Sequence, residues 1–100
     1  MSWEGFEIEQ IAAAQPAGAV LGYYRTAAGA ELDLVAQVQG RTLAFEVKLS
    51  SAPKPARGFW QALDDVKPDR VLVVAPVDRG YELAAGVRVV GLAELALQLK

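Results

Sequence analysis

Two carboxylates and a lysine stand on either side of a short turn, and their types and spacing could support metal and phosphate chemistry. Asp33 lies in a stretch that alternates polar and apolar residues, and Glu46 and Lys48 lie in a second such stretch after Gln39-Gly40. This alternation predicts two strands of a hairpin, each with one buried face. A two-residue turn would place Asp33 directly opposite Glu46, and a four-residue loop would still leave them diagonal neighbours.

Opposed carboxylates of this kind need a cation. The β-carbons of directly opposed residues lie about 5 Å apart, and like charges there are destabilising. Lys48 supplies part of the neutralisation, and a divalent metal supplies more, because Mg²⁺ is typically held by one or two carboxylates with waters and phosphate oxygens. The alternative is a solvated polar face on a half-exposed hairpin, and the bare pattern of Asp33, Glu46 and Lys48 favours that alternative.

The apolar residues of the two stretches are expected to share the other face of the hairpin, because a slip of one residue would bury the charges. With the two-residue turn, Leu34 faces Phe45 and Leu32 faces Val47. On the polar face, the same register pairs Glu31 with Lys48.

A third carboxylate precedes the hairpin, in a helix predicted to run from Trp3 to Ala14. Glu4 lies four residues before Ile8 and seven before Ile11. A carboxylate at the end of an apolar helix stripe points towards the sheet. A favourable charge in the first helical turn explains Glu4 equally well.

The order of elements around these residues predicts an α/β fold: a restriction-endonuclease-like αβββαβ core with a mixed sheet flanked by helices. Strands are predicted for Val20 to Arg25, Glu31 to Val38 and Thr42 to Leu49. A helix carrying Phe59, Leu63 and Val66 follows. The valine-rich run from Arg70 to Ala75 is typical of a buried strand, parallel to the third because a helix connects them. Val87 to Val90 and Leu92 to Leu99 are expected to add a short strand and a last helix.

Composition limits the available chemistry. The 100 residues, 53% of them hydrophobic, predict a single globular domain spanning residues 1–100. The chain has no cysteine and no histidine, which excludes disulfides, thiolate metal sites and imidazole bases. No apolar run could span a bilayer and the N-terminus lacks a signal-peptide pattern, so a cytoplasmic protein without a membrane partner is expected. The net charge of -2 argues against high-affinity, non-specific binding of nucleic acid.

Several segments together resemble the PD-(D/E)XK nuclease superfamily: Trp3-Glu4-Gly5-Phe6, Gly29-Ala30-Glu31-Leu32-Asp33 and Phe45-Glu46-Val47-Lys48. With Arg57-Gly58-Phe59-Trp60-Gln61-Ala62-Leu63, the chain looks most like the C-terminal domain of unknown function of certain prokaryotic AAA-type P-loop ATPases. The resemblance runs from about Ser2 to about Val90, and its specificity comes from the combination and order of the segments. Leu32 stands where the superfamily's name has proline. The ATPase itself is missing, so a truncated relative or a fragment is expected.

The resemblance implies roles for individual residues. Asp33 and Glu46 would be ligands of Mg²⁺ or Mn²⁺, and Lys48 would stabilise the attacking water or the charge developing on the phosphate. Glu4 would be an accessory carboxylate, and Glu31 either a ligand or the partner of Lys48. Gln61 could contact the site, although an ordinary exposed helix residue is the favoured interpretation.

Two functions follow as alternatives. The first is metal-dependent hydrolysis of phosphodiester bonds in DNA or RNA, favoured by the intact set of Asp33, Glu46 and Lys48. The second is a catalytically weak or inactive nuclease-like module that binds a partner or regulates an attached ATPase, favoured by the acidic pI of about 5.0. Lys54 and Arg57 could meet a phosphate backbone, although ordinary surface charges are the favoured interpretation. A homodimer formed through the apolar last helix is a third hypothesis.

Overall fold

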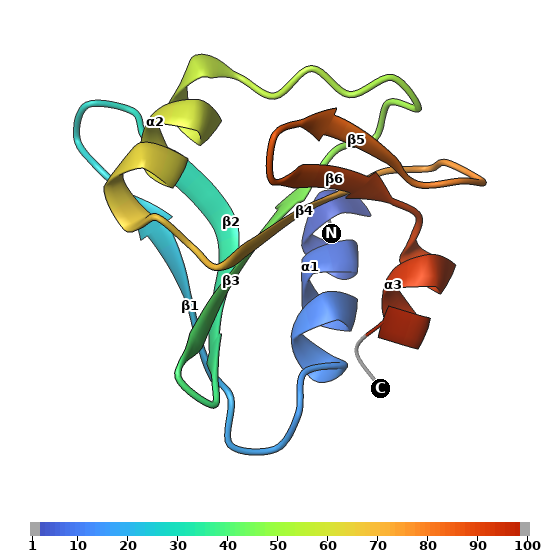
Figure 1. Ribbon diagram of the computed structural model, residues 1–100, viewed down its shortest axis with the longest axis horizontal. Coiled ribbons are helices and arrows are strands. Elements are labelled where there is room, and N and C mark those ends of the chain that lie inside the picture. The colour runs from blue at the N-terminus through green and yellow to red at the C-terminus, as the bar shows by residue number, and fades with distance from the viewer. Residues whose placement is uncertain (1–2, 99–100) are drawn as a thin grey trace.

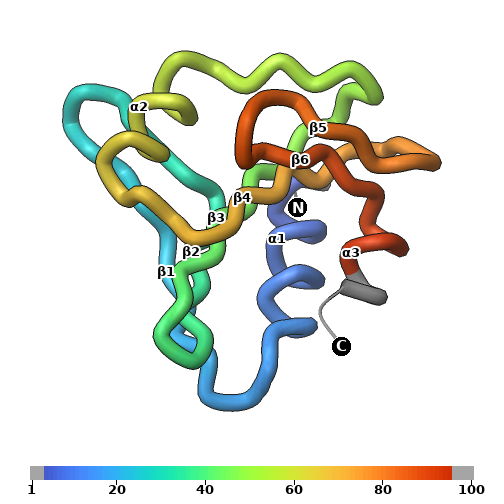
Figure 2. The backbone as a smooth tube through the Cα atoms, viewed as in Figure 1, coloured from blue at the N-terminus to red at the C-terminus, as the bar shows by residue number. Residues whose placement is uncertain are grey.

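The computed structural model describes residues 3–98, which form three helices and six strands (Figure 1). In chain order the elements are α1 (Trp3–Ala13), β1 (Val20–Arg25), β2 (Glu31–Val38), β3 (Arg41–Val47), α2 (Arg57–Val66), β4 (Arg70–Val74), β5 (Tyr81–Ala84), β6 (Val87–Val90) and α3 (Leu92–Gln98). The strands make one mixed sheet in the order β1-β2-β3-β4-β6-β5. The backbone trace in Figure 2 shows the segment 48–56 leaving the end of β3 and crossing the molecule to reach α2.

Helices cover both faces of this sheet, so it has two cores. On one face, Phe59 and Ala62 of α2 pack against Ala44, Val71 and Val73. The other face packs against α1 and α3, and the buried residues there are Ile11, Leu34, Ala36, Phe45, Val47, Leu72, Val74, Val90 and Leu95. Because both faces are covered, the central strand β4 can be apolar along most of its length.

The structure confirms the expected α/β fold. The first three strands form an antiparallel meander, and β4 is buried and parallel to β3, with Phe45 beside Leu72. The two-residue turn is also confirmed, since Val38 pairs with Arg41 and Leu34 with Phe45. Its two residues, Gln39 and Gly40, both have positive φ, the geometry that suits the twist of a tight hairpin.

One strand, β5, was not predicted from the sequence, whereas the last helix is present as expected. β5 pairs antiparallel with β6 at the sheet edge, but its four residues show no clear alternation. In α3, Leu95 is buried in the core and Leu92 packs against it, and a dimer contact through this helix stays a prediction. Leu99, the expected end of this helix, lies outside the described residues.

A β-bulge in β2 alters the expected alternation beside the candidate site. Gly22 pairs with Val35 but Tyr24 pairs with Leu32, so β2 uses one residue more than β1 over this stretch. Leu32 therefore joins the core on the α2 side, whereas Val47 lies in the core on the α1 side. The expected pairing of Leu32 with Val47 is wrong because the bulge switches the face to which Leu32 points.

Candidate functional site

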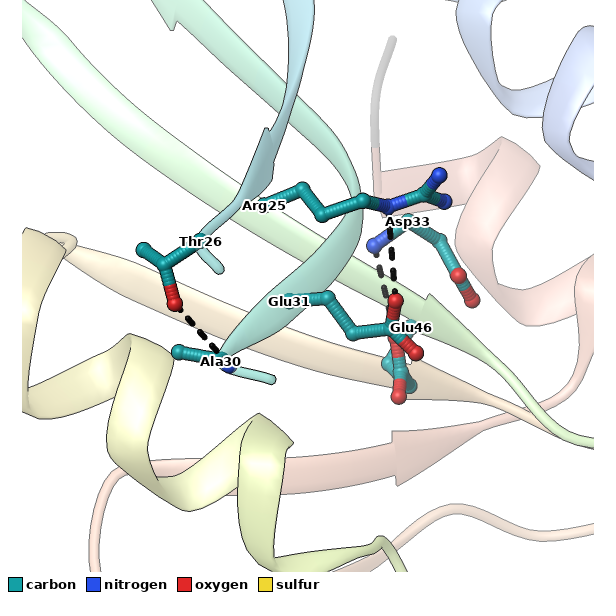
Figure 3. Close-up of polar contacts among 6 residues, drawn as sticks. All are labelled: Arg25, Thr26, Ala30, Glu31, Asp33 and Glu46. Atoms are coloured by element: carbon teal, nitrogen blue, oxygen red, sulfur yellow. Dashed lines mark hydrogen bonds and ion pairs between the residues drawn. The ribbon is translucent and has the colours of Figure 1, made fainter. Parts of the chain in front are cut away.

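The candidate site lies where the β2–β3 hairpin opens. The paired register runs from the turn as far as Leu34 and Phe45, and the next residues are Asp33 and Glu46. From this point on, the side-chain carboxylates of Asp33 and Glu46 accept hydrogen bonds from backbone N–H groups of the opposite strand. Asp33 N–H donates to Glu46 Oε1 at 3.3 Å (Figure 3), and Val47 N–H donates to Asp33 Oδ2 at 2.8 Å. Each carboxylate thus satisfies a backbone donor of the opposite strand, which holds both side chains in the gap. Asp33 and Glu46 are called the carboxylate pair below.

Glu46 is largely removed from water, whereas Asp33 is half-buried. Glu46 is only 5% exposed, and among the residues that the structure describes it is the one polar or charged residue in the buried class. Lys48 Nζ lies 3.7 Å from Glu46 Oε2, while about a third of the lysine side chain remains exposed. Lys48 therefore connects the buried carboxylate with the surface, where a substrate could reach it.

Burial and charge repulsion give Glu46 an unusual proton affinity. Burial, followed by the negative charge of Asp33 and a hydrogen bond with it, raises the pKa of Glu46 to about 8, although the positive charge of Lys48 opposes the rise. At neutral pH the Glu46 side chain is therefore mostly protonated, although a glutamate in water is ionised. A bound cation would relieve the same repulsion, so the chemistry of these donors fits a divalent metal.

A carboxylate that sequence reasoning missed lies on α1. Glu7 stands four residues before Ile11, which is 1% exposed, so Glu7 lies on the helix face that packs against the sheet. Its Oε2 is buried and has no hydrogen-bond partner among the described residues, and burial together with Glu4 raises the pKa of Glu7. Glu4 is exposed in the first turn, which agrees with its alternative role as a favourable helix charge. The missed signal was the spacing of Glu7 from Ile11.

The first turns of α1 also lie at the correct end of the sheet. Ile8 packs against the core that contains Val47, the last residue of β3. Figure 1 shows the N-terminal end of α1 beside the end of β3. Glu7 therefore lies towards this end of the sheet, on the face that carries Phe45 and Val47, whereas Glu46 alternates with those two residues and pairs with Val73 of the α2-side core.

A family comparison now identifies the type of domain. A family model described as a domain of unknown function, DUF4143, matches residues 1–95. The chain belongs to this DUF4143 family. It is 41% identical over 83 residues to the uncharacterized proteins Rv2008c of Mycobacterium tuberculosis and Mb2031c of Mycobacterium bovis. The match covers 83% of this chain but 19% of each relative, so the chain spans about a fifth of the length of these curated relatives. No solved structure matches the chain.

Glu31 of the DUF4143 domain has a different partner from the one expected. It forms an ion pair with Arg25 at 3.4 Å, drawn in Figure 3, and both side chains are more than half exposed. The Arg25 guanidinium also lies 5.5 Å from the ring centre of Tyr23. The expected pairing of Glu31 with Lys48 is wrong, because Lys48 turns to Glu46 where the hairpin opens.

The other candidates of the DUF4143 domain lie on α2 or before it. Gln61 Nε2 donates to Asp65 Oδ1 at 3.2 Å, and Asp65 Oδ2 accepts a hydrogen bond from Tyr24 at 3.0 Å. Gln61 and Arg57 line a groove between α2 and the 26–30 turn. Lys54 and Arg57 are exposed, as expected for surface charges. The hydrogen bond to Asp65 supports the interpretation of Gln61 as an exposed helix residue.

The DUF4143 domain could offer a metal two carboxylate ligands. Within residues 3–98, no three or more aspartate and glutamate side chains gather closely enough to hold an ion. A cation here would be held by Asp33 and Glu46, with oxygens of water or substrate in the remaining positions. In the same described range, no helix has the length and hydrophobicity needed to cross a membrane.

Proposed function

We propose that this DUF4143 domain is a metal-dependent nuclease-like domain of the PD-(D/E)XK type, which hydrolyses phosphodiester bonds of DNA or RNA. The observation that carries the proposal is the burial of Glu46 beside Asp33 and Lys48. A solvated polar face would leave a glutamate exposed, because burying a charge beside a second carboxylate costs free energy. That unfavourable arrangement is typical of a functional site.

The residues of the site would divide the work as follows. Asp33 and Glu46 would hold Mg²⁺ or Mn²⁺, which, when bound, lowers the pKa of water and stabilises charge on a phosphate oxygen. The two backbone hydrogen bonds orient the carboxylate pair before substrate arrives. Lys48, partly exposed, would donate from Nζ to the attacking water or to a phosphate oxygen.

The isolated chain is expected to be a slow enzyme. Its net charge of -2 offers little long-range attraction for a polyanion. The matched relatives are about five times longer than the matched segment, and we propose that their additional residues include an AAA-type ATPase that delivers substrate. The same charge favours the second candidate function, an inactive nuclease-like module that binds a partner or regulates the ATPase.

Cleavage assays would separate these two functions. We expect slow, Mn²⁺-dependent cleavage at low salt of at least one of branched, single-stranded or linear DNA, or RNA. Asp33→Ala and Lys48→Ala should each lower the rate at least about 100-fold, because each removes charge stabilisation at the reacting phosphate. Asp78→Ala, an exposed carboxylate in the loop before β5, is the matched control and should retain the rate.

Equal cleavage by all variants would show that the activity comes from elsewhere. Absence of cleavage, together with no effect of metal on thermal stability, would favour the inactive module.

Calorimetry tests the metal site independently of turnover. Titration with Mn²⁺ or Mg²⁺ should show weak binding that Glu46→Ala removes, since that change deletes one of two carboxylate ligands. Glu9→Ala, on the exposed side of α1, should bind as the unaltered chain does. Unchanged binding in Glu46→Ala would place the metal at another position.

A further inference from the structure

β1 is an edge strand with an unusual number of exposed apolar side chains. It lies at one end of the strand order, paired with β2. Val20 is 64% exposed, Leu21 43% and Tyr23 71%. Edge strands in soluble proteins are commonly protected by lysine, proline or inward-pointing charge, and β1 has only Arg25, at its last position.

The free side of an edge strand specifies the kind of partner it binds. It presents a row of backbone donors and acceptors, and a second strand is the structure that satisfies them together. Gly22 lies at the middle of β1, and a β-carbon added there would have no atom within 4 Å. A neighbouring backbone can therefore approach β1 closely at Gly22.

We propose that two copies of this chain associate by antiparallel pairing of their β1 strands, with Gly22 at the twofold axis. In this register Leu21 lies opposite the partner's Tyr23, and Val20 lies opposite the partner's Tyr24. Cross-strand pairs of aromatic and aliphatic residues are stabilising. The same six residues thus supply both halves of the contact, as an interface between identical copies requires.

Charge also suits a second copy. Arg25 would lie opposite the partner's Ala19, so no two like charges meet across the interface. The guanidinium is already engaged by Glu31 and by the ring of Tyr23, so pairing would leave no unbalanced charge at the contact. A contact of one strand per copy is smaller than a standard interface, and we expect a dissociation constant on the order of 10–100 µM. The inference is independent of the proposed nuclease function.

Sedimentation velocity of the 100-residue chain between about 5 and 500 µM tests the association. We expect a shift from the 10.7 kDa monomer to a dimer as concentration rises. A Val20→Lys, Tyr23→Lys double variant should remain monomeric, because charges on an edge oppose strand pairing. Tyr81→Lys, on the opposite edge strand β5, should dimerise as the unaltered chain does. Circular dichroism would establish that each variant is folded.

Disulfide formation tests the register. The chain has no cysteine, so Gly22→Cys introduces a single thiol. Opposed residues in an antiparallel pair have α-carbons about 4.5–5.5 Å apart, within the range of a disulfide. Gly22→Cys should therefore form a covalent dimer on mild oxidation much faster than Ala85→Cys, in the exposed β5–β6 turn. A monomer at 500 µM, a dimer that survives the double variant, or equal cross-linking rates would each overturn the proposal.

Discussion

Replacing Glu46 with glutamine should raise the free energy of unfolding, and the increase should grow as pH rises from about 5 to 9. The folded-state pKa of Glu46 is about 8, above its ordinary value of 4.5, so protonation favours the folded chain. That stabilisation is complete below the ordinary pKa and is lost as pH rises through the folded value. Glutamine is neutral throughout and keeps an oxygen that can accept from Asp33 N–H. The gain at pH 9 should be on the order of 3 kcal/mol.

Urea unfolding at pH 5, 7 and 9 measures this effect. Glu9→Gln, an exposed position on α1, is the matched control and should change the free energy of unfolding by less than about 0.5 kcal/mol at each pH. A pH-independent difference between Glu46→Gln and the unaltered chain would show that Glu46 is ionised in the folded protein without cost. Stabilisation by the Gln variant together with loss of metal binding would indicate a site whose stability is sacrificed for function.

Replacing Gly58 with alanine should destabilise the fold by about 2–4 kcal/mol. Gly58 is the second residue of α2, and an added β-carbon would overlap the backbone carbonyl of Gly29. The 26–30 turn cannot easily yield, because Thr26 hydrogen-bonds with both Gly29 and Ala30. On the other side, Phe59 is 1% exposed and fixes the helix to the sheet.

Thermal unfolding at low protein concentration measures this loss, which should appear as a melting temperature lower by roughly 10 °C or more. Gly22→Ala is the matched control. It makes the same chemical change where the added β-carbon meets no neighbouring atom, and its effect should be neutral or slightly stabilising. Equal melting temperatures for the two variants would mean that α2 can move away from the turn without losing core contacts.

Local patterns in the sequence determined most of the fold. Alternation and the Gln39-Gly40 turn are properties of neighbouring residues, and they were sufficient to predict the β2–β3 register as far as Leu34 and Phe45. The valine-rich run that begins at Arg70 predicted the buried strand β4. Its parallel pairing with β3 was also predictable, because a helical crossover constrains the direction of the second strand. The proximity of Asp33 and Glu46 followed from the same local register.

Only the tertiary structure decided what surrounds those two carboxylates. The bulge that turns Leu32 to the α2 side depends on how β1 pairs with β2. The alternation of polar and apolar residues within β2 does not predict that pairing. Glu46 is 5% exposed and Glu7 Oε2 is buried because elements far apart in the chain pack together, and no local sequence pattern records that packing. A polar pattern identifies residues capable of chemistry, but the packing of distant elements sets their exposure and therefore their proton affinity.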